Sequence, residues 1–352
     1  MSDELAHGDQ VSGGPEGAGP AGAGMDGAGA GGAGPDGARA ASAGLESAAA
    51  GGAGLESTAD GGAGSDGAGR ALVLGGGGIT GVAWEVGVLA GLADHGVDLT
   101  GADLVIGTSA GSVVGVDVRS GLPLADFYQV QCSPVQPGET TAKMGRGVMI
   151  KYARAVAFTR DPVKAGRRIG SMALKARTES EDSRRKVFES RIPIFDWPAG
   201  NLKITAIDAA TGSFTVFDAN SGVSLIDAVG ASCAVPGIWP PVTIDGKRYI
   251  DGGMRSATNA DLAAGHKRVV IIAPLTQGFG PIASVATQIQ QLTAQGSEVI
   301  LIKPDKAALL AIGKNVLDPA NRPGAAKAGY EQGASEAQAV AAVWTANVEL
   351  AD

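Results

Sequence analysis

The stretch ALVLGGGGITGVAWEVG, residues 71–87, joins a short apolar strand pattern, four consecutive glycines and the beginning of an apolar helix pattern. Gly76, Gly78 and Gly81 fit G-x-G-x-x-G between a strand and a helix, which is the context of a dinucleotide-binding loop. A dinucleotide-binding oxidoreductase is therefore one interpretation. It also requires an acidic residue at the end of the next strand to hold the ribose, and residues 102–107 end in glycine instead.

The composition of the 352-residue chain changes near residue 70. Residues 1–69 repeat short Gly, Ala, Ser and acidic patterns without one aromatic residue. Such a segment buries too little apolar surface to offset its ordering entropy, so we expect 1–69 to be a disordered low-complexity tail. Residues 1–70 carry ten Asp or Glu and two Arg, which accounts for the whole net charge of −8. The remaining body, 70–352, is close to neutral and suits one large domain.

Strand and helix patterns alternate along this body. Apolar runs typical of strands occur at 102–107, 201–218, 267–274 and 297–304, and helical patterns separate them. Strands separated by helices favour an α/β fold with a largely parallel central sheet covered by helices.

The second strand pattern ends in the pentapeptide GTSAG, which fits G-x-S-x-G between a strand and a helix. The flanking glycines, Gly107 and Gly111, allow a sharp turn that presents the Ser109 hydroxyl at the start of the helix. The helix dipole there favours a nearby oxyanion. Ser109 is thus a candidate nucleophile, and a plain turn of small residues is the alternative.

The glycine loop and the serine turn are more informative together. If their strands are neighbours, the backbone N–H groups of Gly76, Gly77 and Gly78 lie beside Ser109, as an oxyanion hole requires. We therefore expect the first loop to hold a reaction intermediate rather than a cofactor, and neither a cofactor nor a metal is implied.

A nucleophilic serine needs a base, and the chain has three histidines. His7 belongs to the predicted tail and His95 to a turn at a helix end, which leaves His266, in a charged turn. Asp251 is the other candidate, because it ends a short strand and precedes two glycines that can hold it towards a cleft. A tight turn capped by Asp251 fits the spacing equally well.

The glycine loop with Gly81, the turn at Ser109 and the Asp251-Gly252-Gly253 motif, in this order, resemble the patatin-like phospholipases. The resemblance covers about residues 71–274, and the last 78 residues match more loosely. It implies a Ser–Asp dyad on an α/β sheet that hydrolyses acyl esters of lipids. Ser109 would be the nucleophile, Asp251 its base, and the glycine loop the oxyanion hole.

One position departs from the family pattern. The family commonly has Arg or Lys just before the last glycine of its first motif, whereas this chain has Thr80. The backbone donors survive this change but a charge is lost, so a catalytically weak lipid-binding or scaffold protein is a further alternative. Pro236, Ile238, Trp239 and Val242 precede the Asp251 motif and either line an acyl pocket or pack in the core.

Residues 143–191 carry fourteen Lys or Arg and five Asp or Glu, with apolar residues interleaved. This pattern predicts a basic, helical, cap-like insertion. Such a surface is attracted to anionic lipid, so we expect peripheral contact with an anionic membrane, with a solvated helical face as the alternative. The expected partners are a lipid or ester substrate and no nucleic acid, and the oligomeric state stays open.

No run of about 18 apolar residues occurs, and the acidic N-terminal residues lack the apolar core of a signal peptide. These features favour a cytoplasmic protein that is at most peripheral to a membrane. Cys132 and Cys233 are then expected to be reduced thiols rather than one disulfide.

Overall fold

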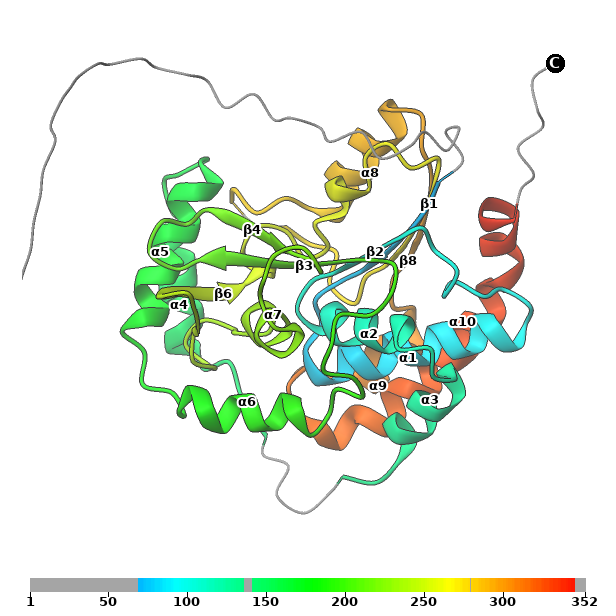
Figure 1. Ribbon diagram of the computed structural model, residues 1–352, viewed down its shortest axis with the longest axis horizontal. Coiled ribbons are helices and arrows are strands. Elements are labelled where there is room, and N and C mark those ends of the chain that lie inside the picture. The colour runs from blue at the N-terminus through cyan, green and yellow to red at the C-terminus, as the bar shows by residue number, and fades with distance from the viewer. Residues whose placement is uncertain (1–68, 136–140, 279, 346–352) are drawn as a thin grey trace, which may run out of the picture. The chain divides into compact units, whose positions relative to one another are not determined.

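The computed structural model describes residues 69–135, 141–278 and 280–345 (Figure 1). The predicted low-complexity tail lies outside the described residues apart from Gly69, and the first strand begins at Arg70.

The described residues form a central sheet in the order β5-β6-β3-β2-β1-β7-β8, with β4 paired to β3 (Figure 1). The parallel strands are β1 (Arg70–Leu74), β2 (Leu104–Gly107), β3 (Asn201–Asp208), β7 (Arg268–Ile272) and β8 (Glu298–Ile302). The strands that pair antiparallel are β4 (Phe214–Phe217), β5 (Val242–Ile244) and β6 (Lys247–Asp251). The predicted α/β fold with a largely parallel sheet is confirmed.

Alternate side chains of β1 pack into two different cores because successive residues of a strand point to opposite faces. Leu72 and Leu74 join the larger core, and Ala71 and Val73 join the smaller one. The larger core is covered by α1 (Gly78–Asp94), α2 (Ala110–Arg119), α3 (Leu124–Cys132), α7 (Leu225–Ser232), α9 (Lys306–Ile312) and α10 (Arg322–Trp344). The smaller core is covered by α8 (Val285–Ala294) and the 3₁₀ turn η2 (Ala260–Ala263).

Helices α1 and α10 pack backbone against backbone. A Cβ atom at Gly87 or Gly91 of α1 would overlap carbonyl groups of α10, and one at Gly329 or Gly333 would overlap carbonyl groups of α1. The contact continues at the indole of Trp84, which donates to a side-chain oxygen of α10 at 3.2 Å. The predicted helical C-terminus therefore packs on one face, as expected.

Residues 143–191 are largely helical, as α4 (Arg146–Val156), α5 (Pro162–Leu174) and α6 (Glu181–Glu189). Ile169 and Ala173 of α5 pack with Tyr152 of α4 on Ile207 and Ile250 of the sheet. Helix α6 packs instead on α7 through Phe188. The insertion therefore covers the antiparallel side of the sheet, next to the end of β6 (Figure 1).

In the ranges that the structure describes, no helix is both long and apolar enough to cross a membrane.

Candidate active site

The turn from β2 into α2 holds Ser109 in a strained conformation. Its φ of 53° and ψ of −118° lie where a residue with a side chain is seldom found. A Cβ at Gly107 would lie 2.6 Å from the carbonyl oxygen of Gly111, and one at Gly111 would overlap the backbone of Leu74. Both glycines are therefore required for this turn to pack against β1, as in a nucleophile elbow.

Helix α7 holds this elbow in place. The Ser109 amide donates to the hydroxyl of Ser232 at 2.9 Å. The Ser109 carbonyl accepts from Ser112 at 2.7 Å and from the Cys233 thiol at 3.2 Å. The amide and carbonyl of Ser109 are thus both bonded, which leaves its side-chain hydroxyl for chemistry.

Asp251 ends β6 and meets Ser109. Its carboxyl is buried, with 3% of the residue exposed, and it accepts a hydrogen bond from the Gly253 amide at 2.7 Å. Burial raises the pKa of Asp251 from 3.8 to about 6, and the nearby Ser109 hydroxyl and the Gly253 amide act against this rise. The structure therefore brings together the two residues that the sequence marked as nucleophile and base.

The glycine loop lies directly beside this pair. A Cβ at Gly76 would approach the Ser109 Cβ to 3.4 Å. The Gly76 amide, however, donates to the Ala257 carbonyl at 2.7 Å, so this N–H is already used. Within the described residues, the amides of Gly77 and Gly78 have no acceptor, which leaves these two donors for a ligand oxygen.

A further free amide follows Ser109, the candidate nucleophile. Ala110 is the first residue of α2, and its N–H has no acceptor in the described part of the chain. The amide after the nucleophile is a usual second donor of an oxyanion hole. Sequence reasoning did not single out Ala110.

Thr80 occupies the position where the family commonly has a basic residue. It is fully buried, and both its amide and its hydroxyl donate to the Val316 carbonyl, at 3.1 and 3.3 Å. Thr80 therefore fixes the first turn of α1 to the connection between α9 and α10, and brings no charge to the loop.

Asn259 links the elbow to the Asp251 turn and was missed at the sequence level. It is fully buried at a φ of 49°, which asparagine tolerates better than most residues. Its amide nitrogen lies 3.0 Å from the Thr108 hydroxyl, 3.2 Å from the Thr205 hydroxyl and 3.3 Å from the Gly252 carbonyl. Its oxygen accepts from Arg255 at 2.8 Å. Asn259 therefore contacts both Thr108, which precedes Ser109, and Gly252, which follows Asp251.

His266 does not reach the site. It precedes β7, whereas Ser109 follows the end of β2, which runs parallel to β7 in the same sheet. Its ring nitrogen lies 3.1 Å from the Ala263 carbonyl instead. The structure thus forms no triad with this histidine.

The other residues with expected roles are also placed. Val242 is buried in the larger core, whereas Ile238 and Trp239 are half-buried. Cys132 and Cys233 are free thiols, as expected. Within the described ranges, no three His, Cys, Asp or Glu side chains gather as a metal ion would need.

A family model described as patatin-like phospholipase matches residues 72–264, which hold the glycine loop, Ser109 and Asp251. The chain belongs to the patatin-like phospholipase family. No sequence among the curated proteins matches it.

Two solved structures are similar at low identity. VipD from Legionella pneumophila aligns with a TM-score of 0.39 and 13% identity, over 77% of this chain and 67% of that one. The type III effector protein ExoU aligns with a TM-score of 0.35 and 15% identity, over 78% of this chain. The aligned region covers 53% of ExoU, about half of its length.

Replacing Asn259 by glycine should lower the free energy of unfolding by about 1–3 kcal/mol, because buried hydroxyls and a carbonyl lose their donor. Alanine should cost about 1 kcal/mol more than glycine, because it also strains the left-handed backbone. Chemical denaturation measures both. Asn220, in an exposed turn, is the control, and Asn220→Gly should change stability by less than about 0.5 kcal/mol. Equal small effects at the two sites would contradict a linking role for Asn259.

Proposed function

We propose that the chain is a serine acyl hydrolase of the lipase or phospholipase A type that cleaves carboxylic esters of lipids. The observation that carries the proposal is the placement of the strained Ser109 next to the buried Asp251, whose pKa the Ser109 hydroxyl lowers. Membership of the patatin-like phospholipase family supports a lipid substrate.

In the proposed reaction, the Ser109 oxygen attacks the ester carbonyl while its proton passes to Asp251. The oxyanion of the tetrahedral intermediate accepts hydrogen bonds from the free amides of Gly77, Gly78 and Ala110. The intermediate then expels the alcohol, which takes the proton from Asp251. Water attacks the acyl-enzyme with Asp251 again as base. The second tetrahedral intermediate then collapses, the proton passes from Asp251 to the Ser109 oxygen, and the fatty acid leaves. Gly76 shapes this loop, since its own amide is bonded to Ala257.

Asp251 suits the task of a base at neutral pH. A base works best when its pKa lies near the operating pH, and burial brings the pKa of this carboxyl to about 6. The loss of the family's basic residue at Thr80 favours the second candidate, a lipid-binding protein with weak activity. Turnover and covalent labelling of Ser109 separate the two.

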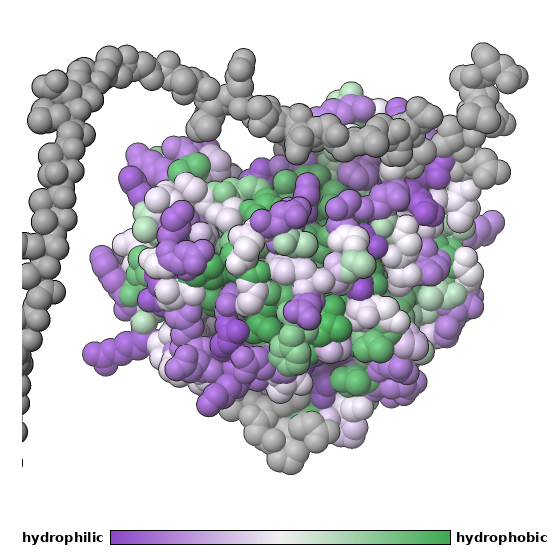
Figure 2. Space-filling view, viewed as in Figure 1, coloured by the Kyte–Doolittle hydropathy of each residue, from purple (hydrophilic) through white to green (hydrophobic). Residues whose placement is uncertain are grey.

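We further propose that residues 143–191 contact an anionic membrane. Residues 143–175 contain nine basic residues and one acidic residue, Asp161. The basic residues are Lys143, Arg146, Lys151, Arg154, Arg160, Lys164, Arg167, Arg168 and Lys175. Exposed apolar side chains lie among them, and Phe158 in the turn between α4 and α5 is fully exposed. Figure 2 shows hydrophilic side chains along the edge formed by α5 and α6. Basic and apolar groups together are typical of interfacial binding.

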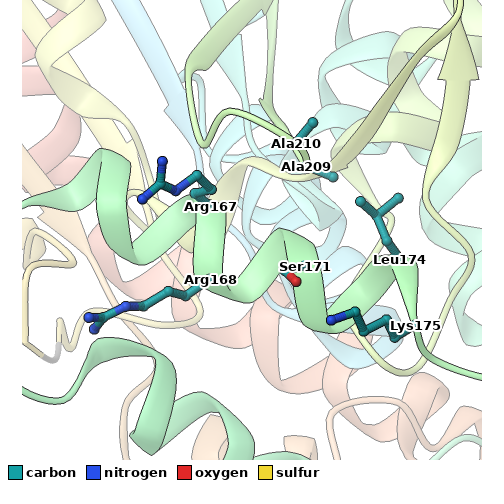
Figure 3. A pocket seen from close by; sticks show the side chains of 7 residues that line it. All are labelled: Arg167, Arg168, Ser171, Leu174, Lys175, Ala209 and Ala210. Carbon is teal, nitrogen blue, oxygen red and sulfur yellow. The ribbon is translucent and has the colours of Figure 1, made fainter.

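Not all of these cations are available to a membrane. Arg168 donates to the carbonyls of Ala155 and Ala157 and so caps the end of α4. A hollow of about 440 Å³ on α5 is flanked by Arg167 and Lys175, as Figure 3 shows. Neither residue of the Ser–Asp pair lines this hollow, so it is a surface feature separate from the reaction centre.

Replacing Ser109 by alanine or Asp251 by asparagine should lower hydrolysis of a p-nitrophenyl ester by about 10³-fold or more, because nucleophile or base is lost. Ser109→Ala should also abolish labelling by a fluorophosphonate probe. His266→Ala is the control and should retain activity, since His266 lies away from the site. A comparable loss in His266→Ala, with the fold intact by circular dichroism, would restore a triad and reject the dyad.

The plot of kcat/KM against pH should rise to a plateau with its midpoint near 6, because Asp251 accepts a proton only when ionised. The raised pKa also carries a stability cost. Because the folded chain binds this proton more tightly than the unfolded chain, Asp251 contributes fully to the free energy of unfolding below about pH 4. That contribution, about 3 kcal/mol, is lost as pH rises through about 6. Asp251→Asn should therefore be more stable than the parent at pH 8 but not at pH 4. A flat pH profile with no such crossover would contradict this assignment.

Replacing Lys164, Arg167 and Lys175 together by glutamine should weaken binding to vesicles that contain phosphatidylserine by about 100-fold, at about 1 kcal/mol for each charge. Hydrolysis of a short-chain soluble ester should not change, and added salt should narrow the difference. The control removes three exposed lysines elsewhere, Lys267, Lys306 and Lys327, with the same change in charge. Equal effects of the two triple variants on vesicle binding would leave α5 as an ordinary surface.

A further inference from the structure

Arg184 on α6 is a stacked cation. Its guanidinium carbon lies 3.9 Å from the centroid of the Trp239 ring and 4.9 Å from that of Phe188. Stacking on aromatic faces holds a guanidinium in one plane and leaves its N–H edge able to bind an oxyanion through two hydrogen bonds.

This guanidinium lacks a counterion. No carboxylate in the described part of the chain lies within ion-pair distance of Arg184, and its Nε is buried without a hydrogen-bond partner. Glu179 attracts it from beyond that distance. The adjacent Arg185, by contrast, pairs with Glu189 at 2.9 Å and with Asp227.

A second stacked arginine, Arg255, has a carboxylate partner. Arg255 lies 4.2 Å from the Phe214 centroid and also pairs with Asp261 at 2.6 Å. Burial lowers the pKa of Arg184, and the neighbouring positive charge of Arg191 lowers it further. Arg184 is half-buried, with its Nε fully enclosed. A partly desolvated cation with no carboxylate within ion-pair distance in the described part of the chain is costly, which favours an anionic ligand.

The stacked cation lies on the α6 side of the elbow. Its charge reaches Cys233, where it lowers the pKa of the thiol against the larger raising effects of burial and Asp251. The same thiol donates to the Ser109 carbonyl at 3.2 Å. Trp239, beneath the guanidinium, belongs to the half-buried segment that precedes the Asp251 strand. Phe188, which also stacks with this guanidinium, lies next to Gly230 of α7, and Ser232 of the same helix accepts a hydrogen bond from the Ser109 amide. Arg184 is therefore held near the helix that supports the elbow.

We propose that Arg184, stacked on Trp239, binds the phosphate of a phospholipid whose ester carbonyl lies at Ser109. This inference rests on the proposed function and names its substrate class, a lipid ester with a phosphate group rather than a neutral glyceride. A phosphodiester carries one negative charge and two free oxygens, which match the N–H edge of one guanidinium.

The activity experiment compares two monomeric substrates with the same acyl chains, dihexanoylphosphatidylcholine and dihexanoylglycerol. Arg184→Gln should lower kcat/KM for the phospholipid by about 10- to 100-fold and for the glyceride by less than about 3-fold. Arg184→Lys should recover only part of the loss, because an ammonium lacks the planar fork. Arg185→Gln, next along the chain, is the matched control and should show no such selectivity. Equal losses on both substrates, or none, would overturn the proposal.

A binding experiment separates this proposal from the catalytic one. The Ser109→Ala chain should bind dihexanoylphosphatidylcholine in a calorimeter, and adding Arg184→Gln should weaken binding by 10-fold or more. This result is expected whether or not Ser109 is the nucleophile. Titration with inorganic phosphate identifies the source of the anion. If inorganic phosphate binds as tightly, and as dependently on Arg184, the site is one for free phosphate and the substrate assignment fails.

Discussion

The close approach of two strand-to-helix turns is the constraint on which the site depends. The amide of Gly111 donates to the carbonyl of Gly75 at 2.9 Å, and a side chain at Gly111 would overlap the backbone of Leu74. The turn after β1 and the turn after β2 therefore touch through their backbones. Only this contact brings Gly76 beside Ser109 and leaves unbonded amides next to a strained hydroxyl.

The strain at Ser109 is balanced by bonds from segments far away in the sequence. Ser232 and Cys233 hold its backbone from α7, and Asn259 joins its neighbour Thr108 to the turn after Asp251. A residue held at positive φ costs roughly 1–3 kcal/mol, which the surrounding structure must offset. The polar network does so in a buried setting, where each satisfied hydrogen bond is strong and each lost one is expensive. Rigidity at the elbow is therefore a property of several segments together.

The basic residues of 143–191 fall into two groups according to their partners. Some cations have structural partners, as Arg168 has at the end of α4 and Arg185 has in its two carboxylates. Others face open surface on α5 or, as Arg184 does, stack on an aromatic ring with no carboxylate within ion-pair distance in the described residues. All of them look alike in the sequence of residues 143–191, where only the total charge is visible. The two proposed anion contacts, with a membrane and with a phosphate, concern the second kind.

The sequence by itself determined the α/β class, the order of the motifs and the identity of the Ser109 and Asp251 candidates. Glycines around a lone serine and an acid at a strand end are local patterns, and local backbone sterics explain them. Tertiary structure decided what depends on contacts between distant segments. It engaged the Gly76 amide with Ala257, placed His266 away from the site, and gave Arg184 no carboxylate partner among the described residues. Hydrogen-bond partners and burial belong to the packed chain rather than to any single stretch, and burial alone raises the pKa of Asp251 to about 6.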